Sequence, residues 1–409
     1  MKARWLFLLA SFALGCPPEP TSHPTPAPRT TVDGPDPLLL AYRPEAFASE
    51  PSLLTRVTAS PFGYFRYTNQ AFIRAVCRTY ADRVDSMPTV NLHGDAHIEQ
   101  YAVAQDGRGL ADFDATTLGP PVVDLARFAT SLALASADRG SSDRAIGAFL
   151  RGYEAALRDP AMSGPEPAVA ARIRAGFSSS ALDWGDGVER LMQPLPAAQT
   201  GKLEEARIQY VSAMLAQNPD LTASFFDLKK VGALRMGLGS AHEKKFLARV
   251  EGPSSDPAND VILEMKQMAP LPVGTCIRGR DPDPLRVVVG QSRLAMSPQR
   301  FLGYVEYEGR TFYVHAWRVH YTELSTSQVR DAEELAEVAY DVGLQLGKGH
   351  PKNIADPSGR ELRESLLALI RELGPSLPEV AAGLAARVTA AHAAFASSVA
   401  VATEPRPGP

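Results

Sequence analysis

The sequence predicts an α+β fold in which a helical block, a small antiparallel sheet and a second helical block follow one another. Residues 38–220 carry apolar residues mainly at helical spacing, and residues 323–409 do so again. Residues 221–322 instead contain short β-branched or aromatic runs separated by Gly, Pro and Asp. Helices and strands that are segregated along a chain form an α+β fold rather than alternating βαβ units.

The first block contains several predicted helices. Apolar residues from Phe72 to Tyr80 recur at helical spacing and predict a helix over 69–83, which Pro88 terminates. A short apolar run over 89–92 follows. The same periodic signal predicts helices over 122–137, 143–157 and 201–217.

The sheet and the last helices have equally simple signals. Short runs around Val231 and over 246–250, 261–265, 286–289 and 311–317 predict strands. Apolar residues from Val329 to Leu346 share one helix face, and Gly347 and Gly349 end that helix. Residues 359–402 supply one or two further helices, the last of them rich in alanine.

The N-terminus predicts export and lipid anchoring. Residues 1–16 join a short basic start to about ten apolar residues, too few to span a bilayer but sufficient for a signal peptide. The segment ends Ala-Leu-Gly-Cys, which resembles a bacterial lipobox with Cys16 as the lipidated residue. A plain secretory signal is the alternative. Residues 17–37 are rich in proline and predict an extended tether between a lipid anchor and the globular part.

Charge and cysteine content narrow the partners. The formal net charge is −4, which gives no global attraction to nucleic acid or to an anionic membrane surface. We therefore expect no nucleic-acid partner, membrane association through the N-terminal lipid alone, and a monomer. No other apolar run looks long enough to span a membrane. Cys77 and Cys276 could pair in an oxidising compartment, but they fall in different predicted substructures, and burial as small apolar residues is favoured.

Two acidic clusters are the strongest internal signal. One is His93-Gly94-Asp95-Ala96-His97-Ile98-Glu99-Gln100, and the other is Asp112-Phe113-Asp114, followed by 119–126 with Asp124. Magnesium takes hard oxygen ligands such as carboxylates, and a separate carboxylate is needed to accept a proton from a hydroxyl nucleophile. The clusters therefore suit a site that holds a metal ion and orients a hydroxyl group.

A second set of residues, later in the chain, suits phosphate binding. Gly237, Gly239 and Ser240 lie between predicted strands, where backbone N–H groups can approach phosphates. Lys266 follows on a strand and can reach the same phosphates. Each feature alone is common in turns and on exposed strands.

The first acidic cluster resembles the catalytic loop of aminoglycoside-phosphotransferase-like and choline-kinase-like enzymes, and Asp112-Phe113-Asp114 resembles their metal-binding segment. The resemblance implies that Asp95 is the catalytic acid–base residue and that His97 orients the loop. It implies Asp112 as the main magnesium ligand, with Asp114 and Gln100 beside it. His93 and Asp124 would support the catalytic loop.

Over roughly residues 50–350 the chain resembles a bacterial family catalogued as domain of unknown function 2252. The shared segments include Ser60-Pro61-Phe62-Gly63-Tyr64-Phe65-Arg66, the two acidic clusters, the Gly-rich loop, the strand lysine, Gly290-Gln291 and Phe301-Leu302-Gly303. The resemblance implies a two-lobed protein-kinase-like fold in circularly permuted order. The helical lobe with the catalytic loop comes first, the small nucleotide lobe second, and C-terminal helices complete the helical lobe.

Several positions depart from the pattern of these families. Gln100 stands where asparagine normally binds a second metal ion, His242 replaces a glycine of the phosphate loop, and Gln267 follows the strand lysine. After the last strand of the sheet, the family pattern Arg-Gln-Leu-Arg-Asp-x-Lys is retained only at Arg318. Arg66 either braces helices or binds substrate. His315 and His320 are expected to be structural.

Three functions remain in competition. The first is a phosphotransferase that uses Mg²⁺ and a nucleotide such as ATP on an unidentified small-molecule or protein acceptor. Export separates such an enzyme from the cytoplasmic ATP pool, so the alternative is a degenerate kinase-like lipoprotein that binds a small molecule or a partner. A metal-dependent phosphoesterase ranks third, because the histidine motifs of that class are missing from the sequence.

Overall fold

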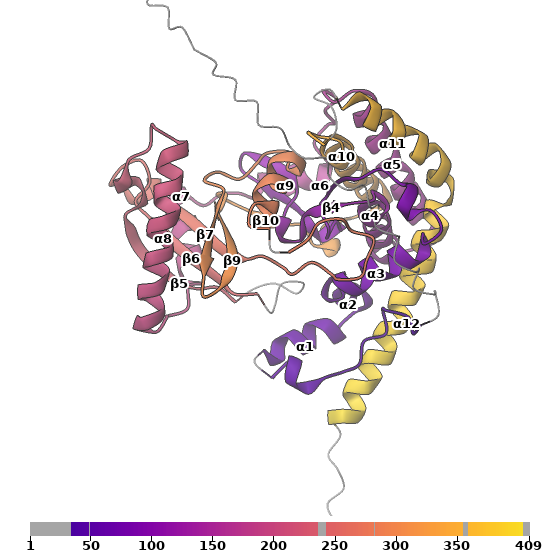
Figure 1. Cartoon of the computed structure of the whole chain (residues 1–409), viewed down its shortest axis with the longest axis horizontal. Helices are drawn as coiled ribbons and strands as arrows, with labels where there is room; N and C mark the ends of the chain where they lie inside the picture. The colour runs from indigo at the N-terminus through magenta and orange to yellow at the C-terminus, as the bar shows by residue number, and fades with distance from the viewer. Residues whose placement is uncertain (1–33, 49, 236–242, 282, 355–358, 404–409) are drawn as a thin grey trace, which may run out of the picture. The chain divides into compact units, whose positions relative to one another are not determined.

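The computed structural model describes residues 34–48, 50–235, 243–281, 283–354 and 359–403. By their contacts, residues Asp36–Pro409 form one unit, separate from Met1–Pro35. Figure 1 shows that helices and strands are segregated in this unit, with β5, β6, β7 and β9 beside α8 and most other long helices near α10. The α+β class predicted from the sequence is confirmed.

Twelve α-helices lie within the described residues. Two of the longest begin at aspartate caps, because the Asp138 side chain accepts a hydrogen bond from the backbone of Ser141 and the Asp331 side chain accepts two in the same way. The helices are α1 (Pro51–Thr58), α2 (Pro61–Tyr67), α3 (Asn69–Thr79), α4 (Val122–Ala135), α5 (Arg139–Arg158), α6 (Ala168–Ala175), α7 (Ala181–Glu189), α8 (Ala197–Gln217), α9 (Arg286–Leu294), α10 (Ala332–Gly349), α11 (Arg360–Leu373) and α12 (Leu377–Thr403).

The strands of the described residues form three antiparallel sheets. The largest has the order β5-β6-β7-β9-β8, and the two small ones are β1-β4 and β10-β2-β3. The strands are β1 (Val90–Leu92), β2 (Tyr101–Ala104), β3 (Gly107–Leu110), β4 (Thr117–Gly119), β5 (Leu228–Ala233), β6 (Lys245–Val250), β7 (Val261–Gln267), β8 (Gly303–Tyr307), β9 (Arg310–Ala316) and β10 (Thr322–Glu323).

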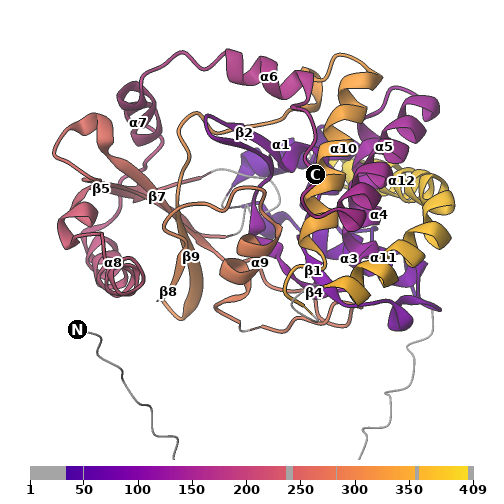
Figure 2. The same cartoon turned by 90° about the horizontal axis from the view of Figure 1, so that it is seen from above.

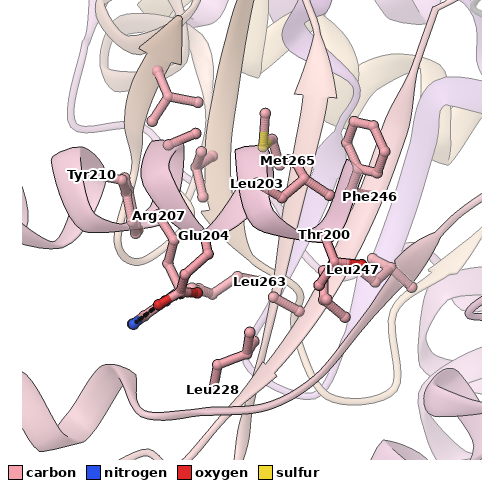
Figure 3. A pocket seen from close by; sticks show the side chains of 15 residues that line it. Thr200, Leu203, Glu204, Arg207, Tyr210, Leu228, Phe246, Leu247, Leu263 and Met265 are labelled. Atoms are coloured by element: carbon pink, nitrogen blue, oxygen red, sulfur yellow. Dashed lines mark hydrogen bonds and ion pairs between the residues drawn. The ribbon is translucent and has the colours of Figure 1, made fainter. Parts of the chain in front are cut away.

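The large sheet has one apolar face, and α8 covers it. On β7, Leu263 and Met265 pack with Leu203 and Tyr210 of α8 in one hydrophobic cluster. Figure 3 shows these side chains between the helix and the strands, where the remaining space is about 50 Å³. Helix α8 thus belongs to the core of the sheet, although the sequence placed it in the helical block that ends at residue 220.

The helical part is built around α4, α5, α10 and α12. Figure 2 shows α10 beside α5 and α4, and α12 covers α4 with Ala381, Leu384 and Val388 buried. The approach of α10 to α5 is so close that a Cβ atom on Gly343 would lie 2.2 Å from the carbonyl oxygen of Phe149. This crossing therefore requires glycine on α10.

The expected strand over 286–289 is wrong, because these residues begin helix α9. Their β-branched content suggested a strand, but Val287, Gly290 and Leu294 are buried at helical spacing. The Cβ position of Gly290 faces Thr116, which leaves room for no larger residue there. The burial of residues at helical spacing against a neighbouring segment outweighed the local β propensity of these residues.

The preference for two unpaired cysteines is also wrong. Cys77 on α3 and Cys276 form a disulfide with a Cα–Cα distance of 5.5 Å. The segment after β7 runs back to the helical part, where the backbone N–H of Arg278 donates to the carbonyl oxygen of Leu118. The two cysteines are 199 residues apart, so the local pattern around each carried no sign of the other.

One region of the described chain, Arg360–Ala402, is long and apolar enough to span a membrane by length and composition. The sequence analysis had found no such run beyond the N-terminus. The region comprises α11 and α12, separated by a short 3-10 turn. Core helices pass the same test, and buried residues of α12 such as Val388 and Phe395 belong to the main hydrophobic cluster, so this is weak evidence for a membrane span.

We expect reduction of the Cys77–Cys276 disulfide to lower the free energy of unfolding by about 2–5 kcal/mol, because the bond closes a very long loop in the unfolded chain. Urea unfolding of the full chain with and without a thiol reductant measures the difference. The double variant Cys77→Ala/Cys276→Ala should unfold like the reduced protein and should not respond to the reductant. Equal midpoints for the oxidised wild type and this variant would contradict the assignment.

The contact between α5 and α10 generates a second prediction. Gly343→Ala should lower the free energy of unfolding by about 1–3 kcal/mol, because the added methyl group meets the Phe149 carbonyl. Gly383→Ala on α12 is the matched control, since no atom lies within 4 Å of its Cβ position. That variant should raise stability by up to about 1 kcal/mol through helix propensity. Similar losses in both variants would show that the close approach is not the cause.

Candidate functional site

A cavity of about 380 Å³ lies between the loops of the helical part and the face of the large sheet that α8 does not cover. Its walls come from α2, α7, the segments after β1 and β3, and strands β6, β7 and β9. Asp95, His97, Gln100, Asp112 and Lys266 all line it. Residues from both acidic clusters and the later strand lysine are therefore brought together, although Asp95 and Lys266 are far apart in sequence.

The segment after β1 is held in place by hydrogen bonds from its backbone N–H groups. The carboxylate of Asp124 accepts hydrogen bonds from the backbone N–H groups of His93 (2.6 Å) and Gly94 (2.9 Å). Gly94 has a φ of +78°, and a Cβ atom there would meet the Ala115 carbonyl, so the turn requires glycine. His350 Nε2 lies 3.2 Å from the same carboxylate and is fully buried, a contact for which the sequence showed no signal.

His93 links the two acidic clusters. Its Nε2 donates to the carbonyl oxygen of Ala111 at 2.9 Å, and its Nδ1 accepts from the backbone N–H of Asp95 at 3.3 Å. One imidazole therefore ties the residue before Asp112 to the backbone of Asp95. His93 is fully buried and does not line the cavity, so its part is to hold the two segments at a constant spacing.

Asp95 has a partner that the sequence analysis missed. Arg127 on α4 donates from Nε to Asp95 Oδ1 at 2.6 Å and pairs with it again through Nη2. The Arg127 guanidinium is fully buried and lies 4.2 Å from the ring centroid of Phe65. Burial raises the pKa of Asp95, while the charge of Arg127 opposes that rise.

Lys266 joins the sheet to the second acidic cluster. Its ammonium group forms an ion pair with Asp112 and another with Asp114, at 2.8 Å. Asp112 has a φ of +58°, which a non-glycine residue rarely adopts, and this conformation turns the chain toward the lysine. Burial lowers the affinity of Lys266 for its proton, but the two carboxylates outweigh burial and hold its pKa well above the ordinary value.

The two carboxylates differ in their protonation. Burial raises the pKa of Asp114, and the neighbouring charge of Asp112 raises it further, to about 7. Burial acts in the same direction on Asp112, but the charges of Lys266 and Lys245 outweigh it and hold the pKa of Asp112 below its ordinary value. Asp112 is thus the stronger candidate for a cation ligand.

Gln100 provides a test of whether a metal ion fits. Its amide Nε2 lies 3.4 Å from Asp95 Oδ2 and 3.5 Å from Asp112 Oδ2, while its buried Oε1 has no hydrogen-bond partner among the described residues. Hard oxygen atoms from a carboxylate and an amide suit Mg²⁺. No group of three or more His, Cys, Asp or Glu side chains forms a ready metal site in the described part of the chain. Asp112 therefore fits a cation that brings its remaining ligands with it, as Mg²⁺ does with phosphate and water, and Gln100 fits the same cation once its amide turns so that Oε1 takes the place of Nε2.

His97 and Arg66 lie at the cavity wall. Burial lowers the pKa of His97 well below its ordinary value, with Arg66 and Arg127 adding to the effect, so the imidazole is neutral. Its Nε2 lies 3.9 Å from Asp95 Oδ2. Arg66 donates to Glu99 at 2.9 Å and also lines the cavity, so its geometry serves either of the two roles considered for it.

A second lysine, which the sequence analysis did not single out, stands beside Lys266. Lys245 is opposite Lys266 in the register of β6 and β7, lines the same cavity and is 8% exposed. Burial lowers the pKa of Lys245, and the charge of Lys266 lowers it further. Two ammonium groups at one end of a cavity attract an anion with more than one charged oxygen atom.

The sheet also brings polar residues into the cavity that the sequence left unassigned. Glu264 on β7 accepts hydrogen bonds from Trp317 Nε1 at 2.7 Å and from His315 Nε2 at 3.2 Å. The ring of His315 stacks on Tyr313. His315 was expected to be structural, and its contact with Glu264 at the cavity wall shows that it also shapes the cavity surface.

A second cavity, of about 390 Å³, reaches the same carboxylates from the side of α3. Asp95, Asp112 and Asp114 line it, together with Asn69 and Arg74 of α3. Asn69 donates to the carbonyl oxygen of Gly94 at 3.0 Å and so connects this wall to the segment that carries Asp95. Asp95 and Asp112 thus line both cavities, and Asp114 lines only the second.

Of the remaining predicted site residues, one lies at the edge of the cavity and the others lie outside the described residues. Arg318 donates to Asp106 at 3.0 Å and to backbone carbonyl groups of the Ser297–Pro298 segment, at the edge of the cavity. The predicted phosphate loop with Gly237, Gly239 and Ser240, and the predicted lipidation site Cys16, lie outside the described residues.

Sequence signals differ among the residues that were missed. Arg127 lies three residues after Asp124 and directly follows the segment 119–126, so an arginine on an otherwise apolar helix was a usable signal. Lys245 is one of two adjacent lysines, and alternation along a strand places one of the pair in the cavity. Glu264 shares a face with Lys266 by the same period of two.

Comparison with protein-family models gives one match. The model described as "Uncharacterized protein conserved in bacteria (DUF2252)" matches residues 51–193 and 185–398, which together cover most of the chain. Comparison with curated proteins and with solved structures gave no match. The matched segments include both acidic clusters, the sheet with Lys266 and the helices that complete the helical part. The chain therefore belongs to this family of uncharacterized bacterial proteins.

Proposed function

We propose that this protein is a metal-dependent phosphotransferase with a kinase-like fold in circularly permuted order. One observation carries the proposal: Lys266 of the sheet forms ion pairs with Asp112 and Asp114 at a cavity that Asp95 also lines. A lysine on a strand that meets an acidic metal-binding segment, beside a separate catalytic carboxylate, is the arrangement that phosphoryl transfer uses.

The element order supports the permutation. The segment with Asp95 and Asp112 comes before the antiparallel sheet, and α10 to α12 return to pack on α4 and α5. In the kinase arrangement the sheet with the lysine precedes the catalytic segment. The same parts occur here in a rotated order, which is compatible with one fold because contacts, rather than chain order, hold the parts together.

The donor nucleotide would occupy the cavity of about 380 Å³. Lys245 and Lys266 would bind its phosphates, and Asp112 and Gln100 would hold Mg²⁺. The cation would neutralise charge on the transferred phosphoryl group. When the phosphates bind, Lys266 would exchange its ion pairs with Asp112 and Asp114 for contacts with the phosphates. The two carboxylates would then be available to the cation.

The acceptor would approach through the second cavity, on the side of α3. Asp95 is the one acid of the first cluster that lines both cavities, so it can accept the proton of an acceptor hydroxyl group near the donor phosphates. Neutral His97 cannot donate a proton at pH 7 and serves to shape the wall. Arg127 holds the Asp95 carboxylate in one orientation.

We also propose export, with Cys16 as the lipid anchor on the cell envelope. The Cys77–Cys276 disulfide supports an oxidising location, since such bonds form and persist outside the cytosol.

A binding module without catalysis is the second candidate. The ion pair between Asp95 and Arg127 favours it, because a carboxylate that is already paired with a guanidinium is a weaker base. Under this alternative the cavity with Lys245 and Lys266 still binds an anionic ligand, but no phosphoryl group is transferred.

Magnesium-dependent nucleotide binding tests the proposal. We expect a nucleoside triphosphate with Mg²⁺, at about a hundredfold above its Kd, to add roughly 2.7 kcal/mol to the stability of the full chain. Asp112→Asn should remove the magnesium dependence, and Lys245→Met should weaken binding roughly 30-fold or more because a buried charge contact is lost. Thermal unfolding and titration calorimetry measure both effects.

Lys244→Met is the matched control. Lys244 precedes Lys245 but pairs with exposed Glu308 away from the cavity, so this variant should bind like the wild type. If no nucleotide stabilises the wild type with or without Mg²⁺, the phosphotransferase proposal is wrong and the binding module remains. If Lys244→Met and Lys245→Met weaken binding equally, the cavity is not the nucleotide site.

A further inference from the structure

The cavity face of β7 presents three kinds of chemistry in a row. Side chains two residues apart on a strand share a face and stand about 7 Å apart. Ile262 packs among apolar residues below α7, Glu264 carries a buried carboxylate, and Lys266 ends the row with its ammonium group. A ligand that lies along β7 with its anionic end at Lys266 therefore places its next group beside Glu264.

The neighbouring strands continue this row only in part, because Arg249 of β6 stands opposite Ile262 and Tyr313 of β9 stands opposite Lys266. On β6, Lys245 is opposite Lys266 and apolar Leu247 is opposite Glu264. On β9, His315 is opposite Glu264, and Trp317 follows as the backbone partner of Ile262. Strands β6 and β7 thus build the cationic end of the cavity, and Ile262 of β7 with Trp317 after β9 builds the apolar end.

The apolar end is flat and partly aromatic. Trp184 and Val188 of α7 line the cavity there, with Leu234 and Trp317 on the side of the sheet. Trp184 and Trp317 pack on the small apolar cluster that contains Val188, Leu234 and Ile262. Indole rings and aliphatic side chains of this kind pack well against the faces of a planar ring system.

Glu264 has one oxygen atom committed and one available. Its Oε2 accepts from Trp317 Nε1 and from His315 Nε2, whereas no described residue donates to Oε1. Burial acts to raise the pKa of Glu264, but the hydrogen bond and charge of His315 outweigh it and hold the pKa at about 2. The side chain is therefore an ionised acceptor that can only receive hydrogen bonds at neutral pH.

We propose that this cavity selects a guanine base, with the Glu264 carboxylate accepting hydrogen bonds from the base and with Lys245 and Lys266 on the phosphates. The inference rests on the proposed nucleotide-binding function and adds the identity of the base. Guanine presents two adjacent donors, N1–H and the 2-amino group, which match the acceptor-only chemistry of a carboxylate. Adenine presents a donor beside the lone pair of N1, and that lone pair would face the carboxylate charge.

Binding constants for guanine and adenine nucleotides test the proposal. We expect the full chain with Mg²⁺ to bind non-hydrolysable GTP at least about tenfold more tightly than the ATP analogue, because adenine would turn a lone pair toward the free carboxylate oxygen. Titration calorimetry measures both, and competition against a fluorescent guanine nucleotide gives an independent value.

Glu264→Gln gives the sharper test because its outcome is reciprocal. The Trp317 indole can only donate, so it retains the amide oxygen and leaves the new NH₂ group toward the cavity. Xanthine carries a carbonyl oxygen where guanine carries the 2-amino group. The variant should therefore lose at least about tenfold in affinity for the GTP analogue, as a mispaired donor–acceptor contact does, and should gain affinity for the xanthine nucleotide.

Glu306→Gln on β8 is the matched control, because Glu306 accepts from Thr311 and does not line the cavity. This variant should keep the wild-type preference. Equal or tighter binding of the ATP analogue by the wild type would overturn guanine selection while leaving the proposed function in place. A Glu264→Gln variant that loses all nucleotides equally, without a gain for xanthine, would also overturn it. Failure of every nucleotide to bind the wild type would reject the proposed function itself.

Discussion

The ion pairs of Lys266 with Asp112 and Asp114 are the interaction on which the cavity depends. They connect a central strand of the sheet to the acidic segment of the helical part, where Lys266 and Asp114 are buried and the side chain of Asp112 is 23% exposed. A buried charge is tolerated only when it is paired, so a shift of the sheet away from the loops would leave one lysine and two carboxylates without compensation. The same ion pairs bring Lys245 and Lys266 of the sheet to the cavity that Asp95 lines. Two separate regions of the sequence thereby form one site.

The loops that meet Lys266 are held by buried polar contacts rather than by strands of any length. Asp124 binds the backbone of the segment with Asp95, His93 connects that segment to the one with Asp112, and Arg127 holds the Asp95 carboxylate. Such networks are costly when incomplete and orient their members when satisfied. The close contact of α5 and α10 completes the scaffold, because α10 ends at Gly349 and the next residue, His350, reaches Asp124.

The disulfide between α3 and the segment after β7 bears on both structure and location. It holds the chain that returns from the sheet against the helical part, near the second cavity lined by Asn69 and Pro270. It also agrees with the export signal predicted from the first sixteen residues, since disulfides persist in oxidising compartments. A nucleotide-dependent enzyme in that location needs a phosphate donor outside the cytoplasm. The binding experiments test whether the protein binds a nucleotide, whatever the source of that donor.

Much of the fold and about half of the site followed from local sequence. Period-3.6 patterns located the helices near residues 69–79, 122–135 and 332–349, because the side of a helix that faces the core must be apolar. Short β-branched or aromatic runs between Gly, Pro and Asp residues located β6, β7 and β9. Asp95, Asp112 and Asp114 were recognisable because a site for a hard cation needs acids at short spacing along one segment. The family of the chain was recognisable from the same segments.

Tertiary structure decided the rest, because the deciding contacts join residues that carry no local sign of each other. The disulfide joins residues 199 apart, and residues 286–289 begin a helix because Val287, Gly290 and Leu294 are buried along one face of α9. Lys245 and Glu264 have ordinary strand neighbours, and they become part of the site only because the register of β6, β7 and β9 places them in a row with Lys266. Sequence therefore determined which chemical groups this protein has, and the packing of sheet on loops determined which of them act together.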